Sequence, residues 1–439
     1  MKGGLILAAP ASGCGKTTIT LALLYQLRKM GHKVASAKIG PDYIDPTFHR
    51  AASGGPCLNL DSWAMRPETL GALASSLEAQ ADLILCEGMM GLFDGAGVDG
   101  DAGSTADVAA RLGWPVVLIV DVGAQGASAA ATVLGFAKYR PDIHLAGVIF
   151  NRVGGIRHAA MLSTAMAAMG LDIDVLGHVP TYPDIALPER HLGLVPAEEH
   201  QALDKLFARA GQLIGGNVDL GRLPNMARPG RHPPARSTPL VLKPLGQRIA
   251  VARDNAFAFA YPATLDGWRA AGAEIVPFSP LADEPPDPTA DAIFLPGGYP
   301  ELHAGTLAAA SRTLEGLRRA ASRRAVLYGE CGGYMLLGAG LTDGKGERHA
   351  MAGLLPVETS FAAPRLHLGY RSVSLMRDGP LGRAGEVFRG HEFHFASTTS
   401  EDEGDALFQV DNSDGISLGP TGLMDGSVMG SFIHLVDRA

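Results

Sequence analysis

A series of short, wholly apolar segments most constrains how this chain of 439 residues folds. In the first half, these segments are bounded by glycine, proline or aspartate and are separated by stretches long enough for helices. Strands that are apolar throughout are typical of parallel sheets buried on both faces. The pattern therefore predicts an α/β fold with a mostly parallel sheet flanked by helices. The segments are GGLILAA (3–9), KVASAKIG (33–40), DLILCEG (82–88), PVVLIVDV (115–122) and LAGVIFNRV (145–153).

The texture of the chain changes between residues 216 and 246, where proline and arginine are frequent and no periodicity is visible. That composition indicates a linker. Apolar segments then resume, and later segments indicate antiparallel strands. We therefore predict a first domain at 1–215, a linker at 216–246 and a second α/β domain at 247–439. The resuming segments are RIAVARD (248–254), AEIVPF (273–278), AIFLPGG (292–298) and AVLYGE (325–330).

The composition excludes several classes of protein. A net charge of −8 and a pI near 6.0 argue against nucleic acid or an anionic membrane as the main partner. No apolar stretch reaches the ~18 residues that span a bilayer. The first apolar run leads into a glycine loop with a lysine, which favours a cytoplasmic location over a secretory signal. Four cysteines without C-x-x-C spacing indicate neither a disulfide framework nor a zinc site.

The segment SGCGKTT (12–18) follows the first apolar run and precedes an amphipathic helix pattern. In such a loop, backbone N–H groups and the helix N-terminus bind phosphate, a lysine offsets its charge, and a hydroxyl binds Mg²⁺. Pro10 stands where the usual motif has its first glycine, but strand, loop and helix occur in the required order. The sequence therefore predicts an ATP-binding phosphate loop formed by Gly13, Gly15, Lys16, Thr17 and Thr18.

Polar residues follow other predicted strands at the same edge of the sheet, where open α/β sheets bind ligands. KIGPDYIDP (38–46) supplies Lys38 for the phosphates, and the oxygen ligands that Mg²⁺ prefers are found on Thr17, Asp42 and Glu87. Turn capping beside a proline is the structural alternative for Asp42.

Three further positions have both a functional and a structural interpretation. For Asp45 and Asp94, a binding role and a structural role are nearly balanced. Asn151 follows the fifth apolar segment and is a candidate for hydrogen bonding to the nucleotide base. An ordinary turn at the strand end is the alternative for Asn151.

The segment GECGGYM (329–335) places Cys331 on a glycine-lined turn between a strand pattern and a helix pattern. A free cysteine often packs as a small hydrophobe. A helix N-terminus, however, lowers the pKa of a thiol and favours the nucleophilic thiolate. Acyl transfer also requires a base and N–H donors for the oxyanion. His434 is the candidate base, and the backbone N–H groups of Gly298 and Gly332 are the candidate donors.

The segments PGGYPE (296–301), GECGGYM and GSFIH (430–434) resemble class I glutamine amidotransferases in that order. The resemblance implies that Cys331 attacks the side-chain amide of glutamine and that ammonia is released. The His-x-Glu of that family would put a glutamate where this chain has Val436, and Asp437 has the wrong offset. The residue that orients His434 is therefore unassigned, and a Cys–His dyad of the type found in a subgroup is expected.

An ATP site on the same chain as an ammonia source predicts amide formation through an acyl phosphate, since phosphoryl transfer needs mainly positioning and charge stabilisation. Over almost its whole length the chain resembles the cobyrinic or hydrogenobyrinic acid a,c-diamide synthase family. The resemblance rests on KIGPDYIDP, CEGMMGLFDG (86–95), LPERHLGLVPAEE (187–199), PGGYPE, GECGGYM and GHEFH (390–394).

That resemblance implies a dethiobiotin-synthetase-like first domain and a class I glutaminase-like second domain. It implies amidation of the a and c acetate carboxylates of a corrin, with L-glutamine and ATP, in cobalamin biosynthesis. Asp42 and Glu87 match metal positions, a homodimer is expected, and the residues expected near the corrin are Tyr43, Ile44, Asp45 and Asp94. No role is derived for Arg190, His191, His391 and His394. A metal site on the last two is less favoured than a structural role, because residues three apart in a strand face opposite sides.

Three alternatives remain. Cobyric acid synthase joins the same domain types and amidates other carboxylates, although GPDYIDP (40–46) favours the a,c-diamide family. A P-loop switch ATPase with a non-catalytic second domain usually has an early lysine, where this loop has Ala11 and Ser12. A glutaminase domain acting only as a scaffold is the third.

Overall fold

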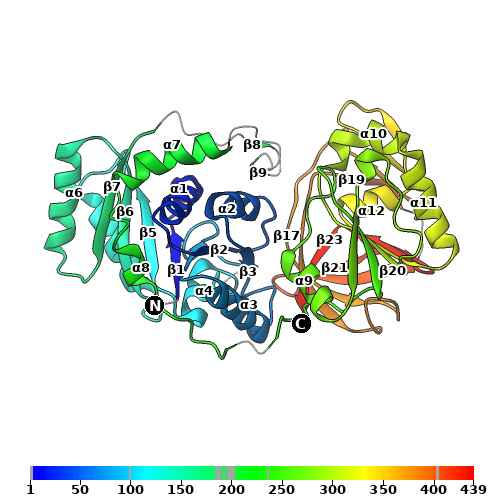
Figure 1. Cartoon of the computed structure of the whole chain (residues 1–439), viewed down its shortest axis with the longest axis horizontal. Coiled ribbons are helices and arrows are strands. Elements are labelled where there is room, and N and C mark those ends of the chain that lie inside the picture. Colours follow the sequence, from blue (N-terminus) through cyan, green and yellow to red (C-terminus); the bar gives the residue numbers. More distant parts are fainter. Residues whose placement is uncertain are drawn as a thin grey trace. The chain divides into compact units, whose positions relative to one another are not determined.

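The five apolar segments of the first half form strands of one sheet in the computed structural model (Figure 1). Two further strands extend it at its edges, in the order β3-β2-β4-β1-β5-β6-β7, and every neighbouring pair is parallel. The prediction of a mostly parallel sheet is therefore confirmed. The strands are β1 (Gly3–Ala8), β2 (Val34–Ile39), β3 (Cys57–Leu60), β4 (Leu83–Glu87), β5 (Val116–Asp121), β6 (Leu145–Val153) and β7 (Asp174–Pro180).

Helices cover both faces of this sheet. In Figure 1, α1, α2 and α7 lie on one side of it, whereas α3 and α4 lie on the other. Strands β1, β2 and β4 have no exposed residue, which explains why their sequences are apolar rather than alternating. The helices are α1 (Lys16–Lys29), α2 (Asp45–Ser53), α3 (Pro67–Gln80), α4 (Thr105–Leu112), α5 (Ser128–Tyr139), α6 (Ile156–Ala168), α7 (Leu203–Gly215) and α8 (Leu223–Met226).

The structure describes residues 3–97, 100–182, 189–190, 193–194, 203–234, 237–401 and 405–439. Short strands β8 (Glu189–Arg190) and β9 (Gly193–Leu194) pair with each other. His191 lies outside the described residues, and only the backbone of Arg190 is described. Within the described part of the chain, no helix is long and apolar enough to cross a membrane.

The chain divides into two compact units. Unit 1 comprises Met1–Trp63 and Pro67–Ser237, and unit 2 comprises Ala64–Arg66 and Thr238–Ala439. Within unit 2, Arg66 forms an ion pair of 2.7 Å with the buried carboxylate of Asp437. In unit 1, the region predicted to be a linker includes α8, and the N–H of Gly4 donates to the carbonyl of Arg228 at 2.9 Å. The domain bounds taken from the sequence remain a prediction.

Unit 2 contains a ten-stranded sheet in the order β11-β10-β12-β13-β22-β21-β20-β17-β18-β23. Pairing is parallel from β11 to β22 and antiparallel beyond. The α/β prediction is confirmed for this unit too. Its strands are β10 (Arg248–Ala252), β11 (Glu274–Phe278), β12 (Ala292–Leu295), β13 (Val326–Glu330), β17 (His367–Leu375), β18 (Val387–His394), β20 (Asp405–Asn412), β21 (Ser417–Asp425), β22 (Val428–Ser431) and β23 (Ile433–Arg438).

A smaller sheet in the order β15-β14-β16-β19 lies in the same unit. Its strands are β14 (Gly340–Thr342), β15 (Arg348–Ala350), β16 (Val357–Ser360) and β19 (Ser397–Glu401). The helices are α9 (Pro262–Ala270), the 3-10 helices η2 (Pro280–Ala282) and η3 (Pro300–His303), α10 (Ala304–Ala309), α11 (Ser311–Ser322) and α12 (Gly332–Leu337).

Candidate active sites

The phosphate loop joins β1 to α1 in unit 1. Gly13 and Gly15 have φ angles of 78° and 84°, a conformation that favours glycine. A Cβ atom on Gly15 would also lie 2.4 Å from the side-chain nitrogen of Asn151. Asn151, at the end of β6, donates from that nitrogen to the carbonyl of Cys14 at 2.9 Å. Asn151 therefore fixes the loop through the carbonyl of Cys14. This contact leaves no room for a side chain at position 15.

The first residues of α1 contact the end of β4 and the loop that follows it. Lys16 is buried, and its ammonium donates to the carbonyl of Met90 at 2.8 Å. The hydroxyl of Thr17 donates to Oε1 of Glu87 at 2.6 Å. Burial lowers the pKa of Lys16, although the charge of Glu87 opposes that shift. The structure thus brings together the phosphate loop and the carboxylate of Glu87, as the sequence predicted.

Glu87 is completely buried, and cationic side chains contact both of its oxygens. Lys38, on β2, donates to Oε1 at 2.9 Å and to the carboxylate of Asp45 at 2.5 Å. His49, on α2, lies 2.8 Å from Oε2. Burial alone would raise the pKa of Glu87, but Lys38 and His49 outweigh burial and hold that pKa well below its usual range. The carboxylate is therefore ionised.

His49 was not identified from the sequence, because an isolated histidine within a helix pattern carries no motif. Burial disfavours its charged ring, but the neighbouring Cys57 and Glu87 outweigh burial and raise the pKa of His49 to about 10. A wholly buried imidazolium therefore fixes one oxygen of Glu87.

The turn before α2 contains the predicted corrin and metal residues. Oδ1 of Asp42 accepts the backbone N–H groups of Ile44 at 2.8 Å and Asp45 at 3.1 Å, so this carboxylate caps the turn, as the structural alternative foresaw. Tyr43 lies in the same turn. Burial, with the charge of Asp42, raises the pKa of Asp45 to about 7 despite its contact with Lys38.

Asp94 lies in the loop after β4. It is exposed, and its Oδ2 accepts the N–H of Gly91 at 2.9 Å. The structure therefore gives Asp94 a local hydrogen bond and leaves its substrate role a prediction.

A cavity of about 530 Å³ lies beside the phosphate loop. The described residues give no hydrogen-bond partner to the buried oxygens of Asn151 and Gln125 near it. Arg152 donates to the carbonyl of Gly13 at 3.2 Å and pairs with the carboxylate of Asp121. Gln125 and Asp121 were missed in the sequence, although Asp121 ends an apolar strand, as Glu87 does. The cavity is lined by Pro10, Ala11, Cys14, Val120, Asp121, Gly123, Ala124, Gln125, Thr132 and Arg152.

In unit 2, Cys331 lies on the turn between β13 and α12. Its φ and ψ angles are 48° and −102°, a strained conformation for a residue with a side chain. The turn is held because the N–H of Cys331 donates to the carbonyl of Ser431 at 2.8 Å. Strained backbone of this kind occurs where a side chain must be presented at a fixed place.

The expectation that the thiol has a lowered pKa is wrong. Cys331 is only 3% exposed, and burial raises its pKa well above the usual range. The charge of Glu301 adds to this shift, and a hydrogen bond from the N–H of Gly332 opposes it. Desolvation outweighs the short helix, so the resting side chain is a neutral thiol that requires a base.

His434, on β23, presents one edge of its ring toward Cys331. A Cβ atom on Gly297 would lie 2.4 Å from Cε1 and 3.3 Å from Nε2 of His434, and 3.3 Å from Cβ of Cys331. Only glycine therefore allows the backbone to lie between these two side chains. Burial, followed by the proximity of the other imidazoles, His391 and His394, holds the pKa of His434 well below its usual value. The ring is a neutral imidazole that can accept a proton.

The two candidate oxyanion donors are neighbours. A Cβ atom on Gly332 would lie 3.2 Å from the backbone nitrogen of Gly298. One N–H comes from the loop after β12, and the other directly follows the nucleophile. An oxyanion formed at Cys331 would therefore lie within reach of both segments.

His391 lies on β18, opposite His434 in the antiparallel register. The two rings stack with centroids 4.9 Å apart and an interplanar angle of 7°. The Tyr261 hydroxyl lies 2.8 Å from Nε2 of His391. Burial, with a smaller effect of Arg371, lowers the pKa of His391 to about 3. His391 is therefore neutral and packs against the ring of His434, the candidate base.

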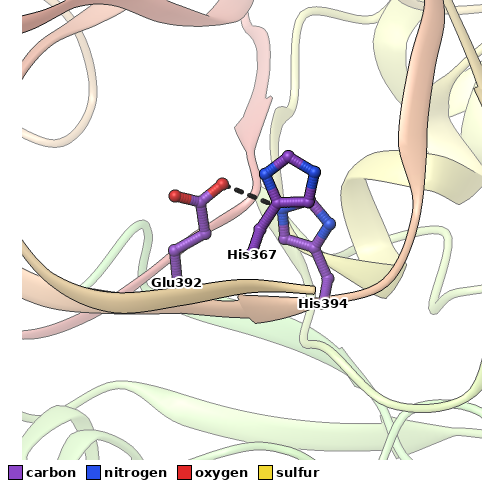
Figure 2. Close-up of side chains that lie close together, drawn as sticks. All are labelled: His367, Glu392 and His394. Atoms are coloured by element: carbon purple, nitrogen blue, oxygen red, sulfur yellow. Dashed lines mark hydrogen bonds and ion pairs between the residues drawn. The ribbon is translucent and has the colours of Figure 1, made fainter. Parts of the chain in front are cut away.

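Three side chains near this site, His367, Glu392 and His394, have ligand atoms within 4.8 Å of one another (Figure 2). The two imidazole rings stack in parallel, with centroids 4.6 Å apart and 4° between their planes, so their nitrogens do not converge on one point. Glu392 already pairs with His394 at 2.8 Å and with Arg371 at 2.8 Å. We interpret the group as an ion-pair cluster. His391 is not part of it, and the structural interpretation of His391 and His394 stays a prediction.

Comparisons with known proteins identify two domain families in this chain. The CobQ/CobB/MinD/ParA nucleotide binding domain family matches residues 5–195, and the CobB/CobQ-like glutamine amidotransferase domain family matches residues 248–438. The fold and the paired sites define a glutamine-dependent ligase with a nucleotide-binding domain.

Relatives of known name match nearly the whole chain. A hydrogenobyrinate a,c-diamide synthase of Brucella abortus biovar 1 (strain 9-941) is 53% identical over 99% of this chain and 98% of its own. Enzymes of the same name from Rhodobacter capsulatus and a Sinorhizobium species are 51% and 50% identical, over 99% of this chain and 98% and 99% of theirs. The chain belongs to the hydrogenobyrinate a,c-diamide synthase family, which confirms the resemblance seen in the sequence.

Proposed function

We propose that this enzyme amidates the a and c acetate carboxylates of hydrogenobyrinate, with L-glutamine as nitrogen donor and ATP as co-substrate, in cobalamin biosynthesis. The observation that carries the proposal is that Cys331 and His434 both border Gly297, on a chain whose phosphate loop also contacts Glu87. The names of the relatives support the choice of substrate.

The nucleotide half of the reaction belongs to unit 1. The loop residues bind the phosphates, and the cavity beside Arg152 receives the base, whose edge meets the buried amide oxygen of Asn151. A magnesium ion would be held by the oxygen donors of Thr17, Asp42 and Glu87, of which the hydroxyl of Thr17 and the ionised carboxylate of Glu87 already lie 2.6 Å apart. The ion would offset charge on the phosphates.

Activation of the corrin follows from this arrangement. A substrate carboxylate attacks the γ-phosphorus of ATP, and the bond to the β-phosphate oxygen breaks, which gives an acyl phosphate and ADP. Ammonia then attacks the acyl carbon and phosphate leaves, which gives the amide. Lys16 and Lys38 offset the moving negative charge. The residues expected beside the corrin are Tyr43, Ile44, Asp45 and Asp94.

The ammonia comes from unit 2. The sulfur of Cys331 attacks the side-chain amide carbon of glutamine while Nε2 of His434 accepts the thiol proton. The N–H groups of Gly298 and Gly332 stabilise the oxyanion. The imidazolium then gives its proton to the departing ammonia, which leaves a thioester. Water hydrolyses the thioester to glutamate and regenerates the thiol.

Mass spectrometry of the products formed from hydrogenobyrinic and cobyrinic acids, with glutamine and MgATP, tests this function. We expect two amides, on the a and c side chains. Amides on other side chains would favour cobyric acid synthase. ATP hydrolysis without amidation would favour a switch ATPase whose second unit only binds or supports a partner.

We also propose a cytoplasmic homodimer without a nucleic-acid or membrane partner. The net charge of −8 supports the absence of polyanionic partners. Light scattering of the purified protein tests the dimer.

A further inference from the structure

The base His434 has no acidic residue two positions later, but a carboxylate approaches its ring from the neighbouring part of the fold. Oε2 of Glu330, the last residue of β13, lies 3.7 Å from Nδ1 of His434. Glu330 is 3% exposed and His434 is 1% exposed, so this approach takes place away from solvent. The contact joins residues that are more than a hundred positions apart in the chain.

Neutral donors hold Glu330 in this orientation. Its Oε1 accepts the backbone N–H of Leu435 at 3.1 Å and the hydroxyl of Tyr328 at 3.0 Å. Leu435 directly follows His434, so the carboxylate is bound to the backbone that carries the base. With Oε1 used in this way, Oε2 is the oxygen that faces the ring.

The two edges of the imidazole therefore have different neighbours. The edge with Nε2 and Cε1 lies against Gly297, which also borders Cys331, whereas Nδ1 lies toward Glu330. An acceptor at Nδ1 retains the ring proton there and leaves the lone pair of Nε2 free for the thiol proton. Asp437, which the sequence placed at the wrong offset, is bound to Arg66.

We propose that Glu330 is the positioning residue of His434: it selects the tautomer in which Nε2 accepts the proton of Cys331, and it stabilises the imidazolium that forms. The proposal rests on the glutaminase role of Cys331 and His434. It replaces the Cys–His dyad expected from the sequence by a set of three residues, in which the acid comes from the residue before the nucleophile.

No other titratable group described around the site is placed to orient His434 in this way. His391 stacks on His434 and is neutral, while Glu392 is paired with Arg371 and His394 on β18. The charge of Glu301, on η3, raises the pKa of Cys331 in addition to burial. Burial raises the pKa of Glu330 to about 8, although the Leu435 N–H and the Tyr328 hydroxyl both lower it. The ionised form, whose negative charge attracts the proton on Nδ1, therefore increases as the pH rises through about 8.

The test is Glu330→Gln in the full chain. Glutamine has the same shape and an oxygen for Leu435, but its amide nitrogen would donate to Nδ1 and favour the wrong tautomer. We expect the kcat for glutamine hydrolysis to fall by roughly 10²–10⁴-fold. The KM for glutamine and the amidation rate with ammonium salt should stay near those of the wild type. The wild-type glutaminase rate should rise through a pH near 8, and this rise should be absent in E330Q.

Two variants separate positioning from structural support. Tyr328→Phe removes one donor to the carboxylate but retains Oε2, so most activity should remain and the pH rise should move to higher pH. Glu330→Asp retains a titrating carboxylate, so a reduced kcat that still rises with pH supports the proposal even where E330Q does not fold. An E330D variant without that rise argues against it.

The role of Glu330 and the glutaminase role of Cys331 and His434 can be disproved separately. If stable E330Q shows wild-type glutaminase kcat with the same pH profile, the role of Glu330 is overturned. If Cys331→Ala or His434→Ala retains glutamine-dependent amidation, the glutaminase site of the proposed function is overturned instead.

Discussion

Two buried glutamates occupy the same place in the two units and have opposite electrostatics. Glu87 ends β4 and Glu330 ends β13, both interior strands with parallel neighbours, and both side chains are almost without solvent contact. Lys38 and His49 surround Glu87, and its pKa is held low. Glu330 receives only a backbone N–H and a hydroxyl, and burial raises its pKa to about 8. The partners, rather than the position or the burial, decide the charge.

The difference suits the chemistry proposed for each unit. A site for phosphates and a cation requires a permanent anion, whereas acyl transfer by a neutral thiol requires groups that exchange protons near neutral pH. Unit 1 neutralises charge by pairing, and unit 2 suppresses charge by desolvation. Substitutions in each unit test that contrast.

The largest expected effect is the separation of the two activities. Cys331→Ala should abolish amidation with glutamine and leave amidation with ammonium salt. Lys16→Ala should abolish turnover with both nitrogen sources, because the phosphates lose their cation. Product formation is measured with each source. Survival of both activities in C331A would contradict the nucleophile assignment, and amidation by K16A would contradict the phosphate loop.

A matched pair of substitutions tests the contrast directly. Glu87→Gln leaves buried cations without their anion and should lower the free energy of unfolding by roughly 3–5 kcal/mol. Glu330→Gln replaces a group that is largely neutral at pH 7 and should leave that free energy unchanged or raise it. Urea denaturation of both variants at pH 7 measures the two effects. Equal losses would mean that the two carboxylates have similar charge.

The pH dependence of stability should differ in sign between these variants. The pKa of Glu330 is about 8 in the folded chain against 4.5 in the unfolded chain, so the unfolded chain loses this proton first. The contribution of Glu330 to stability is therefore lost as the pH rises from about 4.5 to about 8. E330Q should gain on the wild type across that window.

Glu87 should behave in the opposite way, because its folded pKa is depressed. Its contribution is present above the unfolded pKa of 4.5 and is lost as the pH falls further. The cost of E87Q should therefore shrink in acid. Denaturation curves between pH 3 and pH 9 measure the free energy of unfolding of each variant relative to the wild type. If these differences change with pH in the same direction for both variants, the contrast between the two glutamates is wrong.

The smallest effect is expected for Asp42→Asn. The amide oxygen still accepts the N–H groups of Ile44 and Asp45, so the free energy of unfolding should change by only about 0.5 kcal/mol. If Asp42 is a metal ligand, the Mg²⁺ concentration that gives half-maximal turnover should rise. An unchanged requirement would leave Asp42 with its capping role alone.

Local patterns in the sequence predicted much of this molecule. Apolar segments identified five strands of the first sheet and β10 to β13 of the second, and the glycine loop identified the turn between β1 and α1, because each depends on neighbours in the chain. The contact of Glu330 with His434 could not be predicted, since it requires β13, β22 and β23 to be assembled. The raised pKa of Cys331 was also missed, because desolvation depends on what covers the thiol.

The short segment Ala64–Arg66 has a consequence for how such enzymes can be recombined. It comes from the first part of the sequence but belongs to unit 2, where Arg66 pairs with Asp437. A gene divided after residue 237 would therefore encode a second fragment without that arginine. Chimaeras that exchange fragments between relatives at this point would combine Arg66 from one parent with Asp437 from the other. The residue at position 66 should therefore be taken from the parent that supplies the second fragment.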